Sequence, residues 1–180
     1  MQIVTNPFFW AFISMFGLLV GIAMLSGLKL GSNALLGFIT IIANDLSRIV
    51  LVLPFCVQPR FTPGIWNWIV GGMILTVAVC FGVPALSINW RTAPDKNTKL
   101  KTNGIYRFVR NPIYLADILF SLGFAIMFRS IIGIVLAPIW WISFLLIVLV
   151  EEKSLESVLG KPYIEYKRVV KGRIFPGLPI

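Results

Sequence analysis

Five long apolar stretches constrain this chain more than any other feature of its sequence. Each stretch is 17 to 24 residues long, and about 20 predominantly apolar residues cross the hydrocarbon of a bilayer as an α-helix. Backbone groups in lipid must satisfy their own hydrogen bonds, which a helix does within one segment. We therefore predict an all-α fold, a polytopic membrane bundle of about five transmembrane helices followed by C-terminal interfacial helices. The predicted spans are 8–28, 34–57, 65–88, 112–128 and 131–150.

Basic residues gather in two segments outside these stretches. Six of the 16 Lys and Arg residues lie between Arg91 and Arg110, and six more lie between Lys153 and Arg173. Because basic flanks tend to stay on the cytoplasmic side, we expect both segments in the cytoplasm and the N-terminus outside. On a chain that is 58% hydrophobic, the net charge of +9 indicates membrane topology and contact with lipids rather than binding to nucleic acid.

The residues that are absent or isolated also limit the chemistry. The chain has no histidine, the commonest metal ligand and general base, and Cys56 and Cys80 do not form a metal-binding spacing. We therefore expect no metal site. Asp45 and Arg48 lie within the second stretch, three residues apart and close enough to pair on a helix. Charged groups at that depth should face other helices or a cavity, and either a neutralising pair or a substrate-lining role would explain them.

Three motifs follow one another in the second half of the chain. The segment Gly104-Ile-Tyr-Arg-Phe-Val-Arg-Asn-Pro-Ile-Tyr114 precedes the last two apolar stretches, the pair Glu151-Glu152 follows them, and Leu159-Gly-Lys-Pro-Tyr-Ile-Glu-Tyr166 then precedes Arg173-Ile-Phe-Pro176. This order resembles the membrane methyltransferase family that contains isoprenylcysteine carboxyl methyltransferases and phospholipid N-methyltransferases. The resemblance covers about 98–176. The family has Arg-His-Pro or Arg-Asn-Pro at the first motif, and often Gly where this chain has Ala116.

The resemblance implies an S-adenosylmethionine pocket at the cytoplasmic end of the last helical hairpin, open sideways to lipid, and a lipidic or prenylated small-molecule substrate. We treat 1–180 as one membrane domain, in which 1–88 lies on the substrate side and 98–176 holds the cofactor. The resemblance assigns Arg110 and Glu152 as catalytic residues. The expected cofactor-binding residues are Tyr106, Arg110, Asn111, Pro112, Tyr114, Glu151, Glu152, Tyr163 and Tyr166.

The chemistry of these residues agrees with such a cofactor. S-adenosylmethionine carries a sulfonium, an ammonium and a carboxylate, so its site needs both charges beside an aromatic surface. One of Glu151 and Glu152 would contact the ammonium at the membrane boundary, where partial desolvation strengthens the attraction. Alternatively, both glutamates end the apolar stretch and solvate the first turn of a helix.

The basic and aromatic residues leave similar alternatives. Arg107 and Arg110 would share a face if their segment is helical. Arg110 would then clamp a carboxylate, and Arg107 would serve mainly as a topology determinant. Tyr163 and Tyr166 would offer aromatic surface to adenine or anchor the chain at the interface. Asp117 would contact either the cofactor or a neighbouring helix.

Methyl transfer from a sulfonium needs positioning and desolvation rather than histidine. A carboxylate acceptor needs no base, whereas an amine must lose a proton to Glu152 or to water. Two other functions fit the sequence less well. One is an NADPH-dependent reductase of the sterol reductase type, because Ala116-Asp117 partly matches a motif of that family, and the other is a non-enzymatic membrane scaffold.

Overall fold

The structure is a computed structural model that describes residues 3–25, 34–86 and 100–179. Within these ranges the regular structure is helical, apart from one isolated antiparallel bridge between Arg60 and Ser130. The elements are α1 (Pro7–Leu25), α2 (Ala34–Val52), α3 (Ile65–Leu86), the 3-10 helix η2 (Gly104–Arg107), α4 (Pro112–Met127), α5 (Ile131–Leu159) and α6 (Lys161–Val169). The predicted ends of the first span at 26–28 and of the third span at 87–88 lie outside the described residues.

The five long helices fall on the five apolar stretches, so the all-α prediction is confirmed for the described residues. By length and composition α3 and α5 are able to cross a bilayer, and shorter apolar helices occupy Pro7–Ala23 and Pro112–Met127. The predicted end of the fifth stretch at 150 was wrong, because α5 continues to Leu159. No breaker interrupts the charged extension until Gly160, whose φ of 63° lies in the left-handed region that favours glycine.

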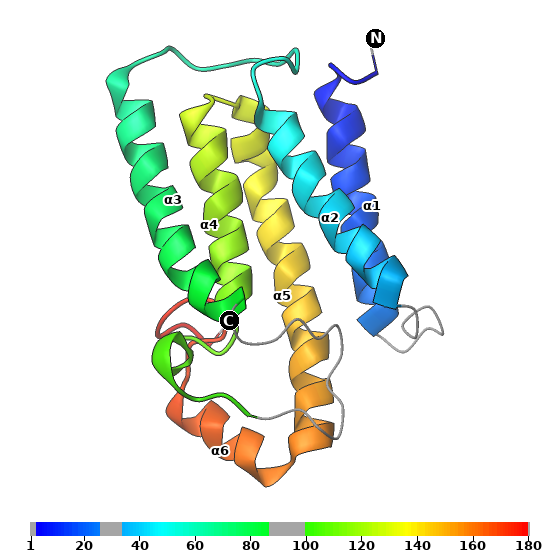
Figure 1. Ribbon diagram of the computed structural model, residues 1–180, viewed down its shortest axis with the longest axis vertical. Coiled ribbons are helices and arrows are strands. Elements are labelled where there is room, and N and C mark those ends of the chain that lie inside the picture. The colour runs from blue at the N-terminus through cyan, green and yellow to red at the C-terminus, as the bar shows by residue number, and fades with distance from the viewer. Residues whose placement is uncertain (1–2, 26–33, 87–99, 180) are drawn as a thin grey trace.

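Small residues bring the helices together. α3 packs most extensively on α4, and a side-chain Cβ built on Gly71 of α3 would lie 2.9 Å from the carbonyl oxygen of Gly123 on α4. Such close backbone approach is how membrane helices gain packing energy. α1 packs on α2 and α5. Figure 1 shows α1 and α2 on the side of the bundle away from α3. The core between these elements includes Leu51, Leu115, Trp140 and Phe144.

The α4–α5 hairpin turns at the predicted place. Arg129 adopts a φ of 62°, and Ser130 caps α5 by accepting a hydrogen bond on Oγ from the backbone N–H of Gly133 at 2.9 Å. At the opposite end α4 begins at Pro112, where a missing N–H costs no helical hydrogen bond. This hairpin places the start of α4 beside the charged extension of α5.

The C-terminal segment closes this lower end of the bundle (Figure 1). The backbone N–H of Arg110 donates to the carbonyl of Gly172 at 2.9 Å, and that of Asn111 donates to the carbonyl of Arg173 at 3.0 Å. The segment before α4 and the C-terminal segment approach each other closely, because a Cβ on Gly172 would lie 2.8 Å from the carbonyl oxygen of Phe108. The segments on either side of the hairpin are thereby held together at one site.

Candidate functional site

Glu152 is the centre of a buried charged group at this end of the bundle. Its residue is 2% exposed. Oε1 accepts from Nε of Arg110 at 2.7 Å and from Nδ2 of Asn111 at 3.1 Å, and Oε2 accepts from Nη2 of Arg110 at 3.3 Å and from Nε of Arg173 at 3.1 Å. We call Arg110, Asn111, Glu152 and Arg173 the Glu152 hub. Both oxygens of the central carboxylate are therefore occupied by donors from this chain.

The guanidinium of Arg110 is also largely occupied. Besides its two bonds to Glu152, its Nη1 donates to the carbonyls of Val170 at 2.7 Å and Lys171 at 3.1 Å. The Arg110 side chain is 4% exposed, and these contacts use most of its five N–H groups. The hub thus ties the start of α4, the extension of α5 and the C-terminal segment to one another.

Glu151 has a different environment from its neighbour. It is half-buried, and its Oε2 accepts a hydrogen bond from the hydroxyl of Tyr114 at 2.8 Å. Within the described residues no Lys or Arg forms an ion pair with Glu151. Among the described residues its hydrogen-bond partner is the neutral Tyr114 hydroxyl. Burial, together with the negative charge of Glu152, raises the pKa of the Glu151 carboxyl, and the hydrogen bond from Tyr114 opposes this effect.

Three tyrosines lie beside these carboxylates. Tyr163 and Tyr166 are buried on α6 with ring centroids 6.0 Å apart, and the Tyr166 hydroxyl donates to the carbonyl of Tyr106 at 2.7 Å. Burial raises the pKa of all three hydroxyls. The negative charge of Glu151 raises the pKa of Tyr106 further, and the negative charge of Glu152 does the same for Tyr163. The hydroxyls therefore stay protonated at neutral pH.

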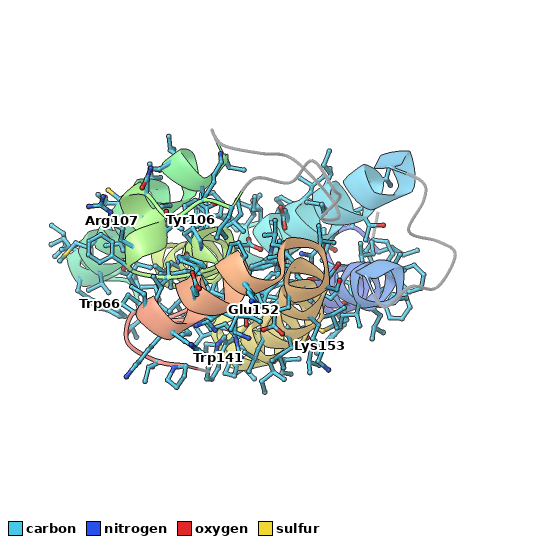
Figure 2. The ribbon with its side chains drawn as sticks, turned by 90° about the horizontal axis from the view of Figure 1, so that it is seen from below. Trp66, Tyr106, Arg107, Trp141, Glu152 and Lys153 are labelled. Carbon is cyan, nitrogen blue, oxygen red and sulfur yellow. The ribbon has the colours of Figure 1, made fainter. Side chains whose placement is uncertain are left out.

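The structure brings the sequence-predicted site residues together at one end of the molecule, in three groups. Arg110, Asn111 and Glu152 meet in the hub beside Pro112, Tyr114 contacts Glu151, and the tyrosines of α6 pack near Tyr106. Figure 2 shows Glu152 near the middle of this end and Arg107 toward its edge. Arg107 is exposed, which fits a contact with lipid phosphate.

Two arrangements that the sequence left open are excluded by the structure. Arg107 and Arg110 do not share a helical face, because η2 ends at Arg107 and Arg110 follows it in a non-helical segment. The two glutamates do not lie in the first turn of a helix, because α5 runs without a break from Ile131 through both of them. The macrodipole of a helix N-terminus therefore does not explain this acidic pair.

Arg173 is a member of the hub that was not among the predicted site residues. Its Nε donates to Glu152, whereas its Nη1 and Nη2 form no hydrogen bond within the described residues, and its side chain is 19% exposed. The motif Arg173-Ile-Phe-Pro176 was the signal that could have identified it. Arg173 is therefore the hub cation whose two terminal nitrogens have no hydrogen-bond partner in the part of the chain that the structure describes.

For Asp117 the sequence allows contact with either the cofactor or a neighbouring helix. In the structure Asp117 contacts the neighbouring helix α2. Both of its carboxylate oxygens accept from Nη2 of Arg48 on α2, at 2.7 and 2.8 Å. The predicted ion pair between Asp45 and Arg48 is also present. Among the described residues no group of three or more His, Cys, Asp or Glu side chains could hold a metal ion.

Comparison with known proteins identifies the family of the chain. A model of the phospholipid methyltransferase family matches residues 66–162, which cover α4, α5, all of α3 but its first residue and the first two residues of α6. Protein-S-isoprenylcysteine O-methyltransferase B of Arabidopsis thaliana is 26% identical over 140 residues, which cover 71% of each chain. No solved structure matches. The family model covers more than half of the sequence and includes both glutamates and the Arg110-Asn111-Pro112 motif, and the chain therefore belongs to the phospholipid methyltransferase family.

Proposed function

We propose that the protein transfers a methyl group from S-adenosylmethionine to a lipidic or prenylated substrate at the membrane. The observation that carries the proposal is the contrast between two adjacent carboxylates. Glu152 is neutralised by Arg110 and Arg173, whereas Glu151 receives one hydrogen bond from a phenol. Glu151 is the group that an external cation would contact.

The side chains around Glu151 fit the cofactor on their own chemistry. Glu151 would bind the ammonium, and the free Nη1 and Nη2 of Arg173 would bind the carboxylate as a fork. The half-buried Tyr106 offers aromatic surface for the adenine. The buried Tyr163 and Tyr166 support it from α6, where the Tyr166 hydroxyl donates to the Tyr106 carbonyl. One end of the bundle therefore combines an anion, a cation and aromatic rings. The charged and aromatic parts of S-adenosylmethionine require this combination.

We assign Arg110, Asn111 and Glu152 to positioning rather than to direct contact with the reacting atoms. Their hydrogen bonds fix the start of α4 against α5, which fixes Glu151 relative to Tyr114. Pro112 supports this arrangement by starting α4 at the hub. A rigid set of contacts of this kind supplies rate by holding reactants in one geometry.

Bound S-adenosylmethionine would supply an electrophilic methyl group on a cationic sulfur, which would leave as a neutral thioether when the acceptor takes the methyl group. A carboxylate acceptor attacks without losing a proton. An amine acceptor releases its proton to water, because both oxygens of Glu152 are already occupied by donors. The chain provides positioning and exclusion of water in either case.

We further propose that all five long helices span the bilayer, with the N-terminus outside and the basic segments in the cytoplasm. The distribution of Lys and Arg supports this orientation. The site then lies at the cytoplasmic membrane boundary, where a soluble cofactor and a lipidic substrate meet. The first three helices would form the substrate side. The Arabidopsis relative is named for an isoprenylcysteine substrate, which supports a prenylated or other lipidic acceptor.

Titration calorimetry of the detergent-purified protein tests the proposal. S-adenosylhomocysteine should bind saturably and NADPH should not. Glu151→Gln should weaken S-adenosylhomocysteine binding by about tenfold to 100-fold, because a charge-assisted hydrogen bond contributes about 1.5–3 kcal/mol. Glu165→Gln, which removes an exposed carboxylate of α6, is the matched control and should bind like wild type.

Each other outcome has a definite meaning. Binding of NADPH alone would replace the methyltransferase proposal with a reductase. Binding of neither ligand would favour the scaffold. Equal affinity of Glu151→Gln and wild type for S-adenosylhomocysteine would show that Glu151 does not contact the ammonium.

A further inference from the structure

The end of the bundle opposite the hub contains a cavity of about 550 Å³. It lies where α2 ends, α3 begins and the α4–α5 hairpin turns, at the upper end of Figure 1. Two arginines line it, Arg60 from the segment between α2 and α3 and Arg129 from the hairpin turn. The rest of the lining is polar, aromatic and apolar, and it includes Asn67, Trp68, Phe128 and Ile65. A cavity of this composition is a typical form of a ligand site.

No acidic residue balances the two arginines of this cavity. The segments 53–68 and 126–134, which form this end of the bundle, contain no Asp or Glu. Within the described residues neither Arg60 nor Arg129 forms an ion pair. Burial and the nearby positive charge of Arg129 both lower the pKa of Arg60. The cavity therefore has an excess of positive charge and favours an anionic occupant.

The two guanidinium groups differ in their hydrogen bonds. Arg60 donates from Nη1 to the carbonyls of Val52 and Phe128, and from Nη2 to those of Leu53 and Cys56. It thereby satisfies the last carbonyls of α2 and α4.

Arg129 is less engaged than Arg60. Its Nη1 approaches the carbonyl of Phe61 at 3.4 Å, and its Nε and Nη2 donate no hydrogen bond within the part of the chain that the structure describes. Nε and Nη2 lie on the same edge of the guanidinium, which is the edge that binds a phosphate or a carboxylate with two parallel hydrogen bonds. Arg129 is therefore the arginine that can contact a ligand, whereas Arg60 holds the helix ends and adds charge.

Hydrogen bonds fix the walls of the cavity. Asn67 is buried; its Oδ1 accepts from the backbone N–H of Gly64 at 3.0 Å, and its Nδ2 donates to the carbonyl of Met127 at 2.9 Å. The start of α3 is therefore tied to the end of α4. Because α3 begins at Ile65, the positive end of its dipole lies at the cavity and adds to the attraction for an anion.

Exposed apolar side chains continue from the cavity along α3. Ile65 lines the cavity and is 78% exposed. Ile69 and Met73 are also exposed, and their spacing of four residues places them in one row with Ile65. The exposed Trp68 lies at the same end of α3, as is common for tryptophan at the boundary between membrane and water. A ligand can therefore place an anionic group in the cavity and hydrocarbon on α3.

We propose that this cavity binds the phosphate group of an anionic phospholipid from the leaflet opposite the cofactor site. Nε and Nη2 of Arg129 donate to the phosphate oxygens, Arg60 and the start of α3 add positive charge, and an acyl chain lies along the row from Ile65 to Met73. A zwitterionic headgroup binds more weakly, because its ammonium is repelled by Arg60.

The bound lipid is not the methyl acceptor. The 16 residues of α4 separate the hub from the cavity by about 24 Å at 1.5 Å per residue. The choice of leaflet rests on the proposed membrane orientation, whereas binding of the phosphate rests on neither that orientation nor methyl transfer.

Native mass spectrometry of the purified protein tests the cavity. The protein is released from micelles that contain equal amounts of dioleoyl phosphatidylglycerol and dioleoyl phosphatidylcholine, and the retained lipids are counted. Wild type should retain phosphatidylglycerol in preference to phosphatidylcholine. Arg129→Gln should lower phosphatidylglycerol retention by about tenfold or more, because it loses charge-assisted hydrogen bonds to the phosphate. Arg168→Gln, which removes an exposed arginine of α6, is the matched control and should retain lipid like wild type.

A second pair of variants keeps the test decisive if Arg129→Gln does not fold. Ile65→Glu places a carboxylate in the cavity as a partner for Arg129, and an acidic residue is favourable in the first turn of a helix. This variant should lose the preference for phosphatidylglycerol. The neutral Ile65→Gln should keep it.

Other outcomes would overturn the proposal. Wild type would then retain the two lipids equally, or a folded Arg129→Gln or Ile65→Glu would retain phosphatidylglycerol like wild type. Equal losses in Arg129→Gln and Arg168→Gln would show that retention depends on overall positive charge rather than on this cavity. Excess sodium phosphate should leave the lipid in place, because inorganic phosphate makes no contact with the apolar row on α3. Displacement by sodium phosphate would assign the cavity to a free anion instead of a lipid.

Discussion

Substituting glutamine for each adjacent glutamate in turn should separate folding from cofactor binding. Glu152→Gln leaves Arg110 and Arg173 without their counterion in a site where the Arg110 side chain is 4% exposed. Breaking a buried ion pair by removing one partner costs about 3–5 kcal/mol. We expect about 3 kcal/mol, at the lower end of that range, because Arg173 is 19% exposed and can gain hydration. This corresponds to a change of roughly 100-fold in the ratio of folded to unfolded protein.

Glu151→Gln should have the opposite profile. Glutamine still offers a carbonyl oxygen to the Tyr114 hydroxyl, so the change in unfolding free energy should stay below about 1 kcal/mol. The loss of negative charge should weaken S-adenosylhomocysteine binding instead. Glu152→Gln should also weaken S-adenosylhomocysteine binding. In this variant the loss of affinity should accompany the loss of stability, because the hub no longer positions Glu151.

Denaturant unfolding in a fixed detergent, followed by tryptophan fluorescence, measures the stability of each variant, and calorimetry measures ligand binding on the same preparations. Glu165→Gln serves as the control in both assays. The division of roles is refuted if Glu151→Gln destabilises the protein as much as Glu152→Gln does. It is equally refuted if Glu152→Gln unfolds like wild type, because the hub would then not hold the end of the bundle together.

Three further substitutions, one of them with a matched control, have definite expected outcomes. Gly172→Ala should lower both stability and S-adenosylhomocysteine binding, because its Cβ would lie 2.8 Å from a backbone carbonyl oxygen. The control is Gly72→Ala, whose Cβ would meet no atom within 4 Å. Thermal melting should show this control to be neutral or slightly stabilising. Tyr166→Phe removes the hydrogen bond to the Tyr106 carbonyl and should cost about 1 kcal/mol of unfolding free energy. In wild type the stability contributed by the Tyr166 hydroxyl should persist below its usual pKa of 10.0 and decline above it, because the pKa is raised in the folded state. Arg60→Met should destabilise the protein by about 2 kcal/mol in denaturant unfolding without changing S-adenosylhomocysteine affinity, since Arg60 donates to backbone carbonyls at the ends of α2 and α4.

The helices could be predicted from the sequence because apolar length is a local property. The five stretches and the hairpin turn at Arg129 and Ser130 follow from neighbouring residues alone. The end of α5 was missed because the charged residues after 150 end the apolar pattern without ending the helix. Apolar length indicates where a helix enters the bilayer, whereas Gly160 determines where the helix itself stops.

The partners of the charged residues could not be predicted in the same way. Asp45 and Arg48 are three residues apart, and their pairing follows from helical geometry. Asp117 is 69 residues from Arg48 in the chain, and its pairing depends on how α2 packs against α4. The bond between Arg110 and Glu152 spans 42 residues. The motifs predict that both residues lie at the cofactor, and the structure adds that they bind each other.

The geometry of one helix explains why the adjacent glutamates would have different roles. Consecutive residues of an α-helix point about 100° apart around its axis, so Glu151 and Glu152 cannot both face the same group. Glu152 points toward Arg110 and the C-terminal segment, and Glu151 points toward Tyr114 on α4. A single acidic residue could either complete the hub or contact an external cation. An acidic pair permits both, and it does so only because α5 continues past the apolar stretch and carries the two side chains on a rigid backbone.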